Sequence, residues 1–252
     1  MTRKIALITG ASRGLGKNTA LHLAAQGVAI IGTYRSSEAE ATAVAQEIER
    51  KGGSAAMLRL EAGDSASFGA FAESIQSLLR TKFGTTHLDY LVNNAGMGIY
   101  GLIADTTEAQ FDALMSVHLK GPFFLTQKLL PLIADGGRIV NISSGLARFS
   151  LPGYGAYAMM KGGIEVMTRY MAKEFGARGI AVNTVAPGAI ETDFGGGKVR
   201  DNKELNAMVK SVTALNRVGL PDDIGGAIAA LLSDGTGWIN AQRIEASGGM
   251  FV

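Results

Sequence analysis

The sequence has no cysteine, only three histidines and only five prolines among its 252 residues. The lack of cysteine excludes disulfides, zinc–thiolate sites, iron–sulfur clusters and cysteine nucleophiles. Because His22, His87 and His118 lie far apart in the chain, we expect no metal site built on histidines. Glycine is abundant instead: the 34 glycines are nearly twice the usual share of about 7% and indicate many tight turns and close backbone approaches.

A strong charge excess and long apolar runs are also missing. The 24 basic and 22 acidic residues give a net charge of +2, which provides no reason to expect binding to nucleic acid or to a membrane surface. The first apolar stretch, Ile5–Ile8, is too short for the hydrophobic region of a signal peptide. No run approaches the roughly 18 apolar residues of a membrane-spanning helix. We therefore expect a cytoplasmic protein.

Short apolar runs alternate with longer amphipathic stretches along the whole chain. We expect buried strands at 5–9, 28–31, 55–60, 90–92, 137–142, 180–185 and 242–245. We expect helices at 15–26, 38–51, 66–83, 108–130, 155–176 and 222–232. This order predicts the α/β class: a doubly wound parallel sheet with helices on both faces, in a single domain spanning residues 1–252.

One segment interrupts this alternation. Residues 193–215 contain three consecutive glycines, Gly195 to Gly197, and then a polar stretch. Two interpretations are open: a solvated surface loop with a short helix, or a mobile lid over a substrate pocket.

A glycine-rich turn follows the first expected strand and opens the first expected helix. Its spacing is G-x-x-x-G-x-G, and the residues expected to contact a dinucleotide are Gly10, Ser12, Arg13, Gly14, Leu15 and Gly16. Such glycines let backbone N–H groups approach a pyrophosphate, and the helix N-terminus adds its positive dipole end. The alternative is an ordinary tight turn between a strand and a helix.

The end of the second expected strand indicates which cofactor is used. It reads Tyr34-Arg35-Ser36, with no acid before Glu38, whereas an NAD site places an acid near this point. Arg35, together with Arg13 in the glycine turn, suits the 2′-phosphate of NADP, because arginine forms charge-assisted, bidentate bonds to phosphate. The alternative is that Arg35 is a solvated loop residue.

Three residues are candidates for acid–base chemistry. Tyr157 and Lys161 are four residues apart on an expected helix, so they share a face, and Ser144 follows an expected strand. The carboxyl edge of the sheet, where ligands bind in open α/β folds, would bring the two hydroxyls together. Each residue also has a structural interpretation: a half-buried tyrosine, a solvated lysine and a serine in a turn.

These motifs, in this order, are those of a known family. With Asn93-Asn94-Ala95-Gly96, the stretch Asn183 to Thr192 and the tail from Gly237 to Gly249, the chain resembles the short-chain dehydrogenase/reductase family along nearly its whole length. Within that family it resembles 3-oxoacyl-[acyl-carrier-protein] reductases and NADPH-dependent carbonyl reductases. The resemblance implies a Rossmann-like fold, and a homotetramer, since the family is commonly tetrameric.

The resemblance also implies roles for individual residues. Ser144 would bind the substrate oxygen, Tyr157 would act as general acid in reduction and base in oxidation, and Lys161 would bind the nicotinamide ribose. A nearby ammonium would also lower the pKa of the Tyr157 phenol, which is near 10 when free. The remaining cofactor contacts implied are Asn94, Ala95 and Gly96 at the adenosine ribose, Glu61 and Ala62 at the adenine, and Pro187, Gly188, Ile190 and Thr192 at the nicotinamide amide.

His118 departs from the family pattern, which usually has asparagine at this position. The family residue is described as holding a helix kink and a water that links the lysine to solvent. His118 can also donate and accept hydrogen bonds, so it could preserve a proton relay, alter its pH dependence or weaken it. A histidine simply packed on a buried helix face is an equally open interpretation.

Two functions remain open at this point. The first is an NADPH-dependent carbonyl reductase that is reversible as an alcohol dehydrogenase; the second is a non-catalytic NADP-binding sensor or interaction protein on the same fold. The small-molecule substrate would lie in a mostly apolar pocket lined by Met97, Gly98, Phe149, Tyr154, Phe194 and Met208. The C-terminal residues 248–252 would lie in a subunit interface or form a core strand.

Overall fold

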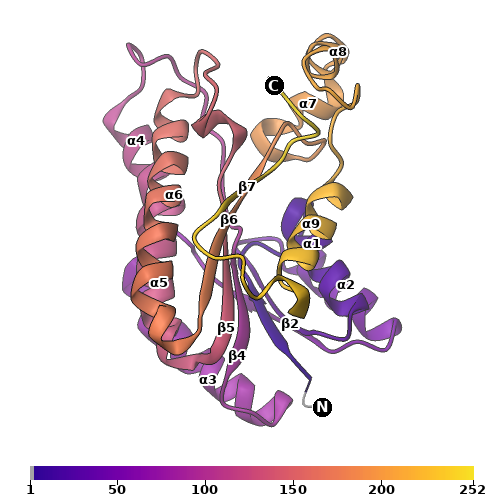
Figure 1. Ribbon diagram of the computed structural model, residues 1–252, viewed down its shortest axis with the longest axis vertical. Helices are drawn as coiled ribbons and strands as arrows, with labels where there is room; N and C mark the ends of the chain where they lie inside the picture. Colours follow the sequence, from indigo (N-terminus) through magenta and orange to yellow (C-terminus); the bar gives the residue numbers. More distant parts are fainter. Residues whose placement is uncertain (1–2) are drawn as a thin grey trace.

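Seven parallel strands form one sheet in the computed structural model, which describes residues 3–252 (Figure 1). The spatial order is β3-β2-β1-β4-β5-β6-β7. The strands are β1 Ile5–Ile8, β2 Ala29–Tyr34, β3 Ala55–Arg59, β4 Leu88–Asn93, β5 Ile133–Ile142, β6 Ala181–Pro187 and β7 Arg243–Ala246. The α/β class and the doubly wound parallel sheet expected from the sequence are confirmed.

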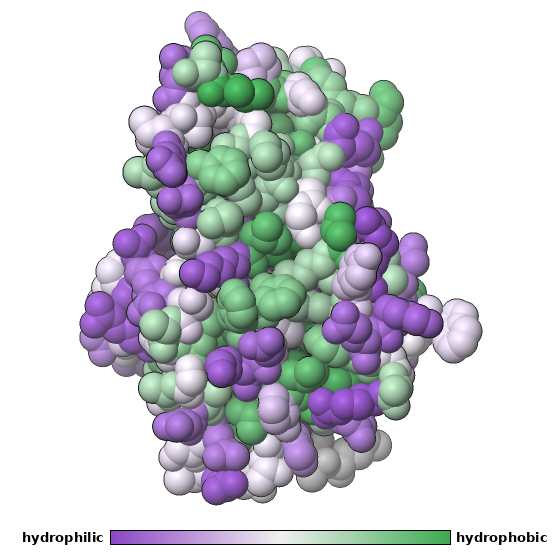
Figure 2. Space-filling view, turned by 90° about the vertical axis from the view of Figure 1, so that its left-hand side faces the viewer, coloured by the Kyte–Doolittle hydropathy of each residue, from purple (hydrophilic) through white to green (hydrophobic). Residues whose placement is uncertain are grey.

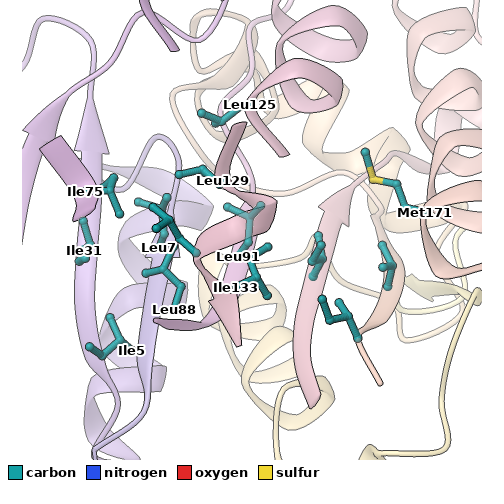
Figure 3. Packing of buried hydrophobic residues seen from close by; sticks show 14 of the residues in the cluster. Ile5, Leu7, Ile31, Ile75, Leu88, Leu91, Leu125, Leu129, Ile133 and Met171 are labelled. Carbon is teal, nitrogen blue, oxygen red and sulfur yellow. The ribbon is translucent and has the colours of Figure 1, made fainter. Parts of the chain in front are cut away.

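Helices cover both faces of the sheet (Figure 1). On one face lie α3 Phe68–Phe83, α4 Glu108–Met115, α5 Gly121–Leu129 and α6 Gly155–Phe175. On the other lie α1 Gly14–Ala25, α2 Glu38–Arg50 and α9 Pro221–Leu231. Successive strand residues point to opposite faces. Ile5 and Leu7 pack in the cluster with α3 and α5 (Figure 3), while Ala6 and Ile8 pack in the cluster with α1 and α9. This double burial explains why the strands are apolar at nearly every position.

The sheet topology places a crevice at the carboxyl end of β1. The chain leaves β1 toward β2 on one side and later returns to β4 on the other side. In open α/β sheets, ligands bind outside the carboxyl ends of the strands at such a reversal. The glycine turn after β1 and the segments after β4, β5 and β6 all reach this edge.

The helix expected at 108–130 is not continuous. It is α4, a π-helical turn at Ser116–Lys120, and then α5. Pro122 has no N–H to donate to the carbonyl of His118, which breaks the regular α-helical ladder at this point. The π turn therefore coincides with His118, the residue that departs from the family pattern.

Other boundaries differ from expectation by a few residues, mostly at element ends. The largest difference is β5, which begins at Ile133 rather than at 137, with a register shift against β4 between Leu88 and Tyr90. The short glycine-containing stretch 134–137 hides this extension from a reading based on apolar runs alone. Between residues 3 and 252, no helix is both long enough and apolar enough to cross a membrane.

The segment 193–215 stands above the carboxyl edge of the sheet (Figure 1). It contains α7 Lys198–Asp201 and α8 Lys203–Ser211. The chain end bonds to it: Leu215 N donates to the Gly248 carbonyl at 3.0 Å, and Phe251 N donates to the Val212 carbonyl at 2.9 Å. The expectation of a core strand at 248–252 is therefore wrong. Met250 alone is buried, against α8, and Val252 is exposed.

Candidate active site

The glycine turn after β1 is open at the N-terminus of α1. Gly10 and Gly14 have φ of +68° and +56°, a conformation that favours glycine. A Cβ on Gly16 would collide with the Gly10 carbonyl, so this glycine is needed for the close approach of α1 to the turn. Arg13 is the N-cap residue of α1 but makes no side-chain cap, and the first helical turn has no acid. The backbone N–H groups of this first helical turn are thus available to an anion, as a pyrophosphate site needs.

Hydrogen bonds join the glycine turn to the segment after β4. The Asn94 amide Nδ2 donates to the carbonyls of Thr9 and Gly10 at 2.8 and 3.1 Å. The Thr9 hydroxyl accepts the N–H groups of Asn94 and Ala95, both at 2.9 Å. The structure therefore brings together the two motifs that the sequence analysis linked only by resemblance. Gly96, next in the motif, packs against the ring of His118.

Arg35 is not a free loop residue. Its guanidinium Nε lies 2.7 Å from Glu61 Oε2, and both side chains are largely exposed. Tyr34 and Ser36 flank it at the end of β2, and Glu61 follows β3, so the pair spans the ends of two neighbouring strands. The residue expected at the adenine thus holds the residue expected at the 2′-phosphate. Ala62 lies farther in: a Cβ on Gly121 at the start of α5 would collide with the Ala62 carbonyl.

Ser144 and Tyr157 meet at the carboxyl edge of β5. Ser144 is the second residue after β5, and Tyr157 lies in the first turn of α6. Burial raises the pKa of the Tyr157 phenol above its usual 10, and a hydrogen bond with the Ser144 side chain opposes that rise. The buried Tyr157 hydroxyl is therefore protonated at neutral pH.

Lys161 lies one helical turn after Tyr157 and is almost fully buried. Its Nζ donates to the Ile142 carbonyl at 2.7 Å and lies 5.6 Å from the centre of the Tyr157 ring. Burial lowers the pKa of Lys161 to about 7. Burial dominates the pKa of the Tyr157 phenol and Ser144 opposes the rise, so a lowering of that pKa by Lys161 stays a prediction.

His118 packs against Tyr157, with ring centres 5.1 Å apart in an edge-on arrangement. Its Nε2 lies 2.6 Å from the Met97 carbonyl, to which it donates, and its Nδ1 is buried without a hydrogen-bond partner among the described residues. Burial, with the Lys161 ammonium as a second cause, lowers the pKa of His118 to about 3. The ring is therefore neutral at physiological pH and offers Nδ1 as an acceptor, but it carries no charge of its own.

The residues after β6 complete the cofactor side of the crevice. Pro187 ends β6, and a Cβ on Gly188 would lie 2.9 Å from Ser247, so glycine allows the β6 and β7 ends to approach. Ile190 pairs with Gly219 in an isolated parallel bridge. The Thr192 methyl group lies 3.8 Å from where a Cβ on Gly14 would be, so the expected nicotinamide and pyrophosphate segments face each other.

Phe194 extends from the segment 193–215 over the reacting residues. Its ring centre lies 5.8 Å from that of Tyr157, and a Cβ on Gly98 would lie 3.0 Å from Phe194 Cε1. The three glycines that follow Phe194 all have positive φ, between 62° and 80°. Farther out, Lys198 Nζ lies 5.7 Å from the ring centre of Tyr100, which stands in the segment after β4. Residues 193–215 therefore contact both Tyr157 and the segment after β4, through Phe194 and Lys198.

The expected pocket residues separate into two groups. Met97 packs in the cluster that contains Tyr157, and Tyr154 stands edge-on to Tyr100 with ring centres 5.6 Å apart. With Gly98 and Phe194, these residues form the entrance to the crevice around Tyr157, which we call the mouth. Phe149 instead packs against Phe251 and under α8, in a separate apolar cluster. Met208 is half-exposed on α8.

Sequence reasoning missed two kinds of residue. Tyr100 and Lys198 at the mouth carry no motif, and only their place in the fold shows them. Glu165, one turn beyond Lys161, is a largely buried acid on the α6 face that the Tyr157–Lys161 spacing had already marked. The available signal in the sequence was an acidic residue four positions after Lys161, on the same face of the expected helix. Its partner Arg243 lies 78 residues away, which no local pattern reveals.

Comparisons with known proteins agree with the fold and with the family that the sequence resembles. The family model described as enoyl-(acyl carrier protein) reductase matches residues 10–251. The 3-oxoacyl-[acyl-carrier-protein] reductase FabG of Staphylococcus aureus is 36% identical over 251 residues, covering 99% of this chain and 98% of the relative. The promiscuous reductase LugOII, which catalyses keto-reduction at C1 during lugdunomycin biosynthesis, superposes with a TM-score of 0.94 at 40% identity, over 100% of this chain and 99% of that one. The angucycline C-6 ketoreductase LanV, solved with bound NADP, gives a TM-score of 0.93 at 35% identity, over 98% and 95%.

Proposed function

The chain belongs to the short-chain dehydrogenase/reductase family, and from this premise we propose that it is an NADPH-dependent ketoreductase. One observation carries the proposal. A buried Tyr157 phenol stands near Ser144 and one turn from a buried Lys161, at the sheet edge that also carries the uncapped N-terminus of α1. Residues 193–215 serve as the substrate lid of the same single domain.

The residues present fit an NADP cofactor. Gly10, Ser12, Gly14, Leu15 and Gly16 form a turn that leaves backbone N–H groups free for the pyrophosphate. Arg35, with Arg13, would bind the 2′-phosphate after exchanging its partner Glu61 for the more highly charged phosphate. The neighbour LanV was solved with NADP bound, which supports the same choice here. When bound, the cofactor supplies the hydride.

The remaining cofactor contacts are proposed from their places along the crevice. Tyr34 and Ser36 border the 2′-phosphate with Arg35, and Ala62 borders the adenine. Asn94, Ala95 and Gly96 would contact the adenosine ribose. Pro187, Gly188, Ile190 and Thr192 would contact the nicotinamide amide; the approach of Thr192 to Gly14 in the glycine turn supports this placement.

Proton transfer follows from the state of the side chains. Ser144 would hold the substrate oxygen, and Tyr157 would give its hydroxyl proton to that oxygen as the carbonyl carbon accepts the hydride. Lys161, whose pKa is about 7, would bind the nicotinamide ribose and can pass a proton to Tyr157 in the next step. The neutral His118 would accept a hydrogen bond at Nδ1 in this relay rather than carry a charge.

The mouth of the site favours a flat, apolar ketone. Tyr100, Tyr154 and Phe194 present aromatic surfaces around Tyr157, and aromatic rings pack well on planar unsaturated substrates. A ketone on a fused-ring skeleton therefore fits the mouth better than a flexible 3-oxoacyl thioester. Comparing kcat/KM for 1-tetralone and an acetoacetyl thioester tests this choice. A higher value for the thioester would contradict it.

A homo-oligomer, of the tetrameric kind common in the family, is part of the proposal. Figure 2 shows the side of the molecule formed by α4, α5 and α6, where apolar residues gather. Exposed apolar side chains on α5 and α6 are Phe123, Phe124, Met159, Val166 and Tyr170. Monomeric proteins rarely leave such patches open to water.

The non-catalytic alternative, an NADP-binding sensor, is separated by one experiment. NADPH oxidation is followed with a panel of ketones for the wild type and for Tyr157→Phe, and cofactor affinity is measured by titration. The proposal expects ketone-dependent oxidation that falls about 10²- to 10⁴-fold in the variant, with NADPH binding retained. Cofactor binding without any ketone-dependent oxidation would favour the sensor.

A further inference from the structure

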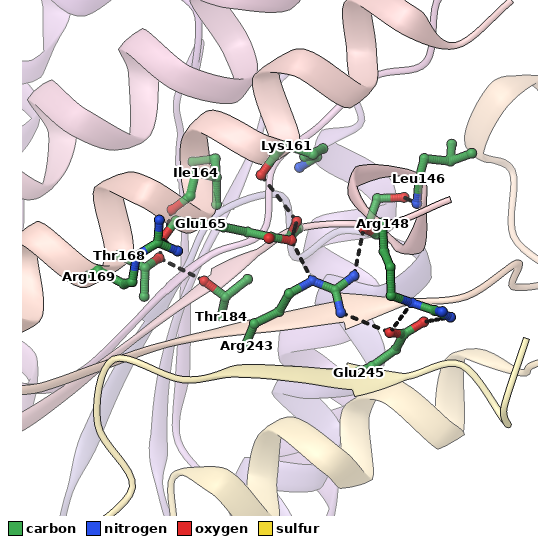
Figure 4. A network of polar contacts seen from close by, with 12 residues as sticks. Leu146, Arg148, Lys161, Ile164, Glu165, Thr168, Arg169, Thr184, Arg243 and Glu245 are labelled. Carbon is green, nitrogen blue, oxygen red and sulfur yellow. Dashed lines mark hydrogen bonds and ion pairs between the residues drawn. The ribbon is translucent and has the colours of Figure 1, made fainter. Parts of the chain in front are cut away.

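A largely buried ion pair joins α6 to the start of β7, one helical turn beyond Lys161 (Figure 4). Glu165 belongs to α6, one turn after Lys161, and Arg243 is the first residue of β7. Their side chains are only 15% and 22% exposed, and Arg243 Nε lies 2.6 Å from Glu165 Oε1. Burying two charges costs their hydration, and only well-placed hydrogen bonds offset that cost. The Glu165–Arg243 pair therefore depends on its exact geometry far more than an exposed ion pair such as Arg35–Glu61 does.

The pair contacts both elements that carry the catalytic residues. Glu165 Oε1 also accepts the Ser143 hydroxyl at 2.7 Å, and that hydroxyl lies 3.2 Å from the Lys161 carbonyl. On the other side, Arg243 NH2 donates to the Ser144 carbonyl at 3.3 Å. The end of β5, which carries Ser144, is thus bonded to α6, which carries Tyr157 and Lys161, through these two charged groups.

Arg243 is held in turn by a second layer of contacts. Its NH1 donates to Glu245 at 2.8 Å, and Glu245 accepts both Nε and NH2 of Arg148. Arg148 also donates to the carbonyls of Met250 and Phe251 in the chain end. The guanidinium of Arg243 therefore donates to three separate acceptors, in Glu165, Glu245 and Ser144. The planar guanidinium group of arginine can reach all three at once, whereas the compact ammonium group of a lysine cannot.

We propose that Glu165 and Arg243 are positioning residues, which fix the Ser144 hydroxyl at the distance from Tyr157 that proton transfer needs. The inference rests on the proposed ketoreductase function and adds two residues to it. Neither side chain touches the reacting atoms. Each acts through the backbone or the neighbour of a catalytic residue, Arg243 on the Ser144 carbonyl and Glu165 on Ser143. Catalysis is sensitive to such placement, because a displacement of about 1 Å at the reacting centre can cost about 10²-fold in rate.

The test compares Arg243→Lys with a matched arginine elsewhere. Arg178 also combines an ion pair, to Asp135 at 2.8 Å, with bonds to two backbone carbonyls, but it lies at the opposite end of α6. For the wild type, Arg243→Lys and Arg178→Lys, we would measure kcat and KM for a ketone, NADPH affinity and thermal unfolding. Arg243→Lys should lower kcat roughly 10- to 100-fold with NADPH affinity within about twofold. Arg178→Lys should keep the wild-type kcat even if it unfolds at a lower temperature.

A wild-type kcat in folded Arg243→Lys would overturn the inference while leaving the proposed function intact. A wild type that reduces no ketone would instead refute the proposed function. In that event crystal structures of the wild type and of Arg243→Lys still decide the positioning role. The inference expects the Ser144 hydroxyl to be displaced relative to Tyr157 in the variant, and an unchanged position would refute it. Glu165→Gln, which keeps an acceptor for Ser143 and Arg243, should retain more activity than Arg243→Lys.

Discussion

Burial decides the protonation states of the residues around Tyr157. The phenol is pushed toward its neutral form, the His118 imidazole is kept neutral, and the Lys161 ammonium becomes easier to deprotonate. All three pKa shifts have the same main cause, which is the cost of placing a charge in a poorly solvated site. The phenol therefore carries the proton that reduction consumes, and a further positive charge is needed to lower its pKa for transfer and to stabilise the phenolate in oxidation.

The Lys161 shift predicts how stability depends on pH. An unfolded lysine has a pKa near 10.5, whereas folded Lys161 has a pKa of about 7, so the unfolded chain binds one more proton between these values. The free energy of unfolding should therefore rise with pH from about 7 upward, and below 7 the buried charge exerts its full cost. Lys161→Met should be more stable than the wild type at pH 6, by a few kcal/mol at about 1.4 kcal/mol per pKa unit, with a smaller advantage at pH 9.

Urea unfolding of the wild type and Lys161→Met at pH 6, 7.5 and 9 measures this difference. His118 also makes stability depend on pH, between its folded pKa of about 3 and its unfolded value of 6.5, but both proteins carry it, so its own contribution cancels from the difference. A stability difference that is the same at all three pH values would show that Lys161 keeps an ordinary pKa.

The Arg35–Glu61 pair predicts cofactor preference. Arg35→Ala should weaken NADPH binding by roughly tenfold and NADH binding by less than twofold, because only NADPH has the 2′-phosphate. Glu61→Gln should tighten NADPH binding a few-fold, because it frees Arg35 and removes a negative charge beside the phosphate. Fluorescence titration with both cofactors measures the change, with Lys51→Ala at the end of α2 as control. Equal losses for both cofactors in Arg35→Ala would contradict the assignment.

For single helices, strands and turns, the sequence predicts the features that depend only on neighbouring residues. The glycine turn, the buried strands and the shared face of Tyr157 and Lys161 all follow from spacing and composition. The π turn at Ser116–Lys120 was missed because apolar periodicity continues through it and only Pro122 marks the break. The pairs Arg35–Glu61 and Glu165–Arg243 join residues that are distant in sequence, so only the sheet order brings them together.

The proposed lid at residues 193–215 leads to a prediction about Gly98 and Phe194. A Cβ at residue 98 would lie 3.0 Å from Phe194 Cε1 and 3.2 Å from its Cζ, which is too close for the ring to stay in place. Gly98→Ala should therefore displace Phe194 and raise KM for the ketone several-fold, with little change in thermal stability because the ring belongs to an exposed segment. Gly69→Ala in α3, where a Cβ meets nothing within 4 Å, is the matched control. Unchanged kinetics in Gly98→Ala would mean that Phe194 does not border the substrate path.

At the scale of the whole molecule, the apolar side formed by α5 and α6 predicts self-association. Val166, 46% exposed on α6, belongs to this side. Val166→Glu would place a charge in the interface, and light scattering should show a smaller assembly than for the wild type. Ala43→Glu on the exposed side of α2 should leave the assembly unchanged. A monomeric wild type, or an intact assembly in Val166→Glu, would count against an interface on this side.

The most direct test of the account follows the hydride and the proton separately. NADPH labelled with deuterium at C4 is mixed with a ketone and either the wild type or Tyr157→Phe, and deuterium at the alcohol carbon is measured by mass spectrometry over time. The account predicts label transfer by the wild type, and transfer about 10²- to 10⁴-fold slower in the variant with cofactor affinity preserved. Transfer at the wild-type rate without the Tyr157 hydroxyl would contradict its role as the proton donor.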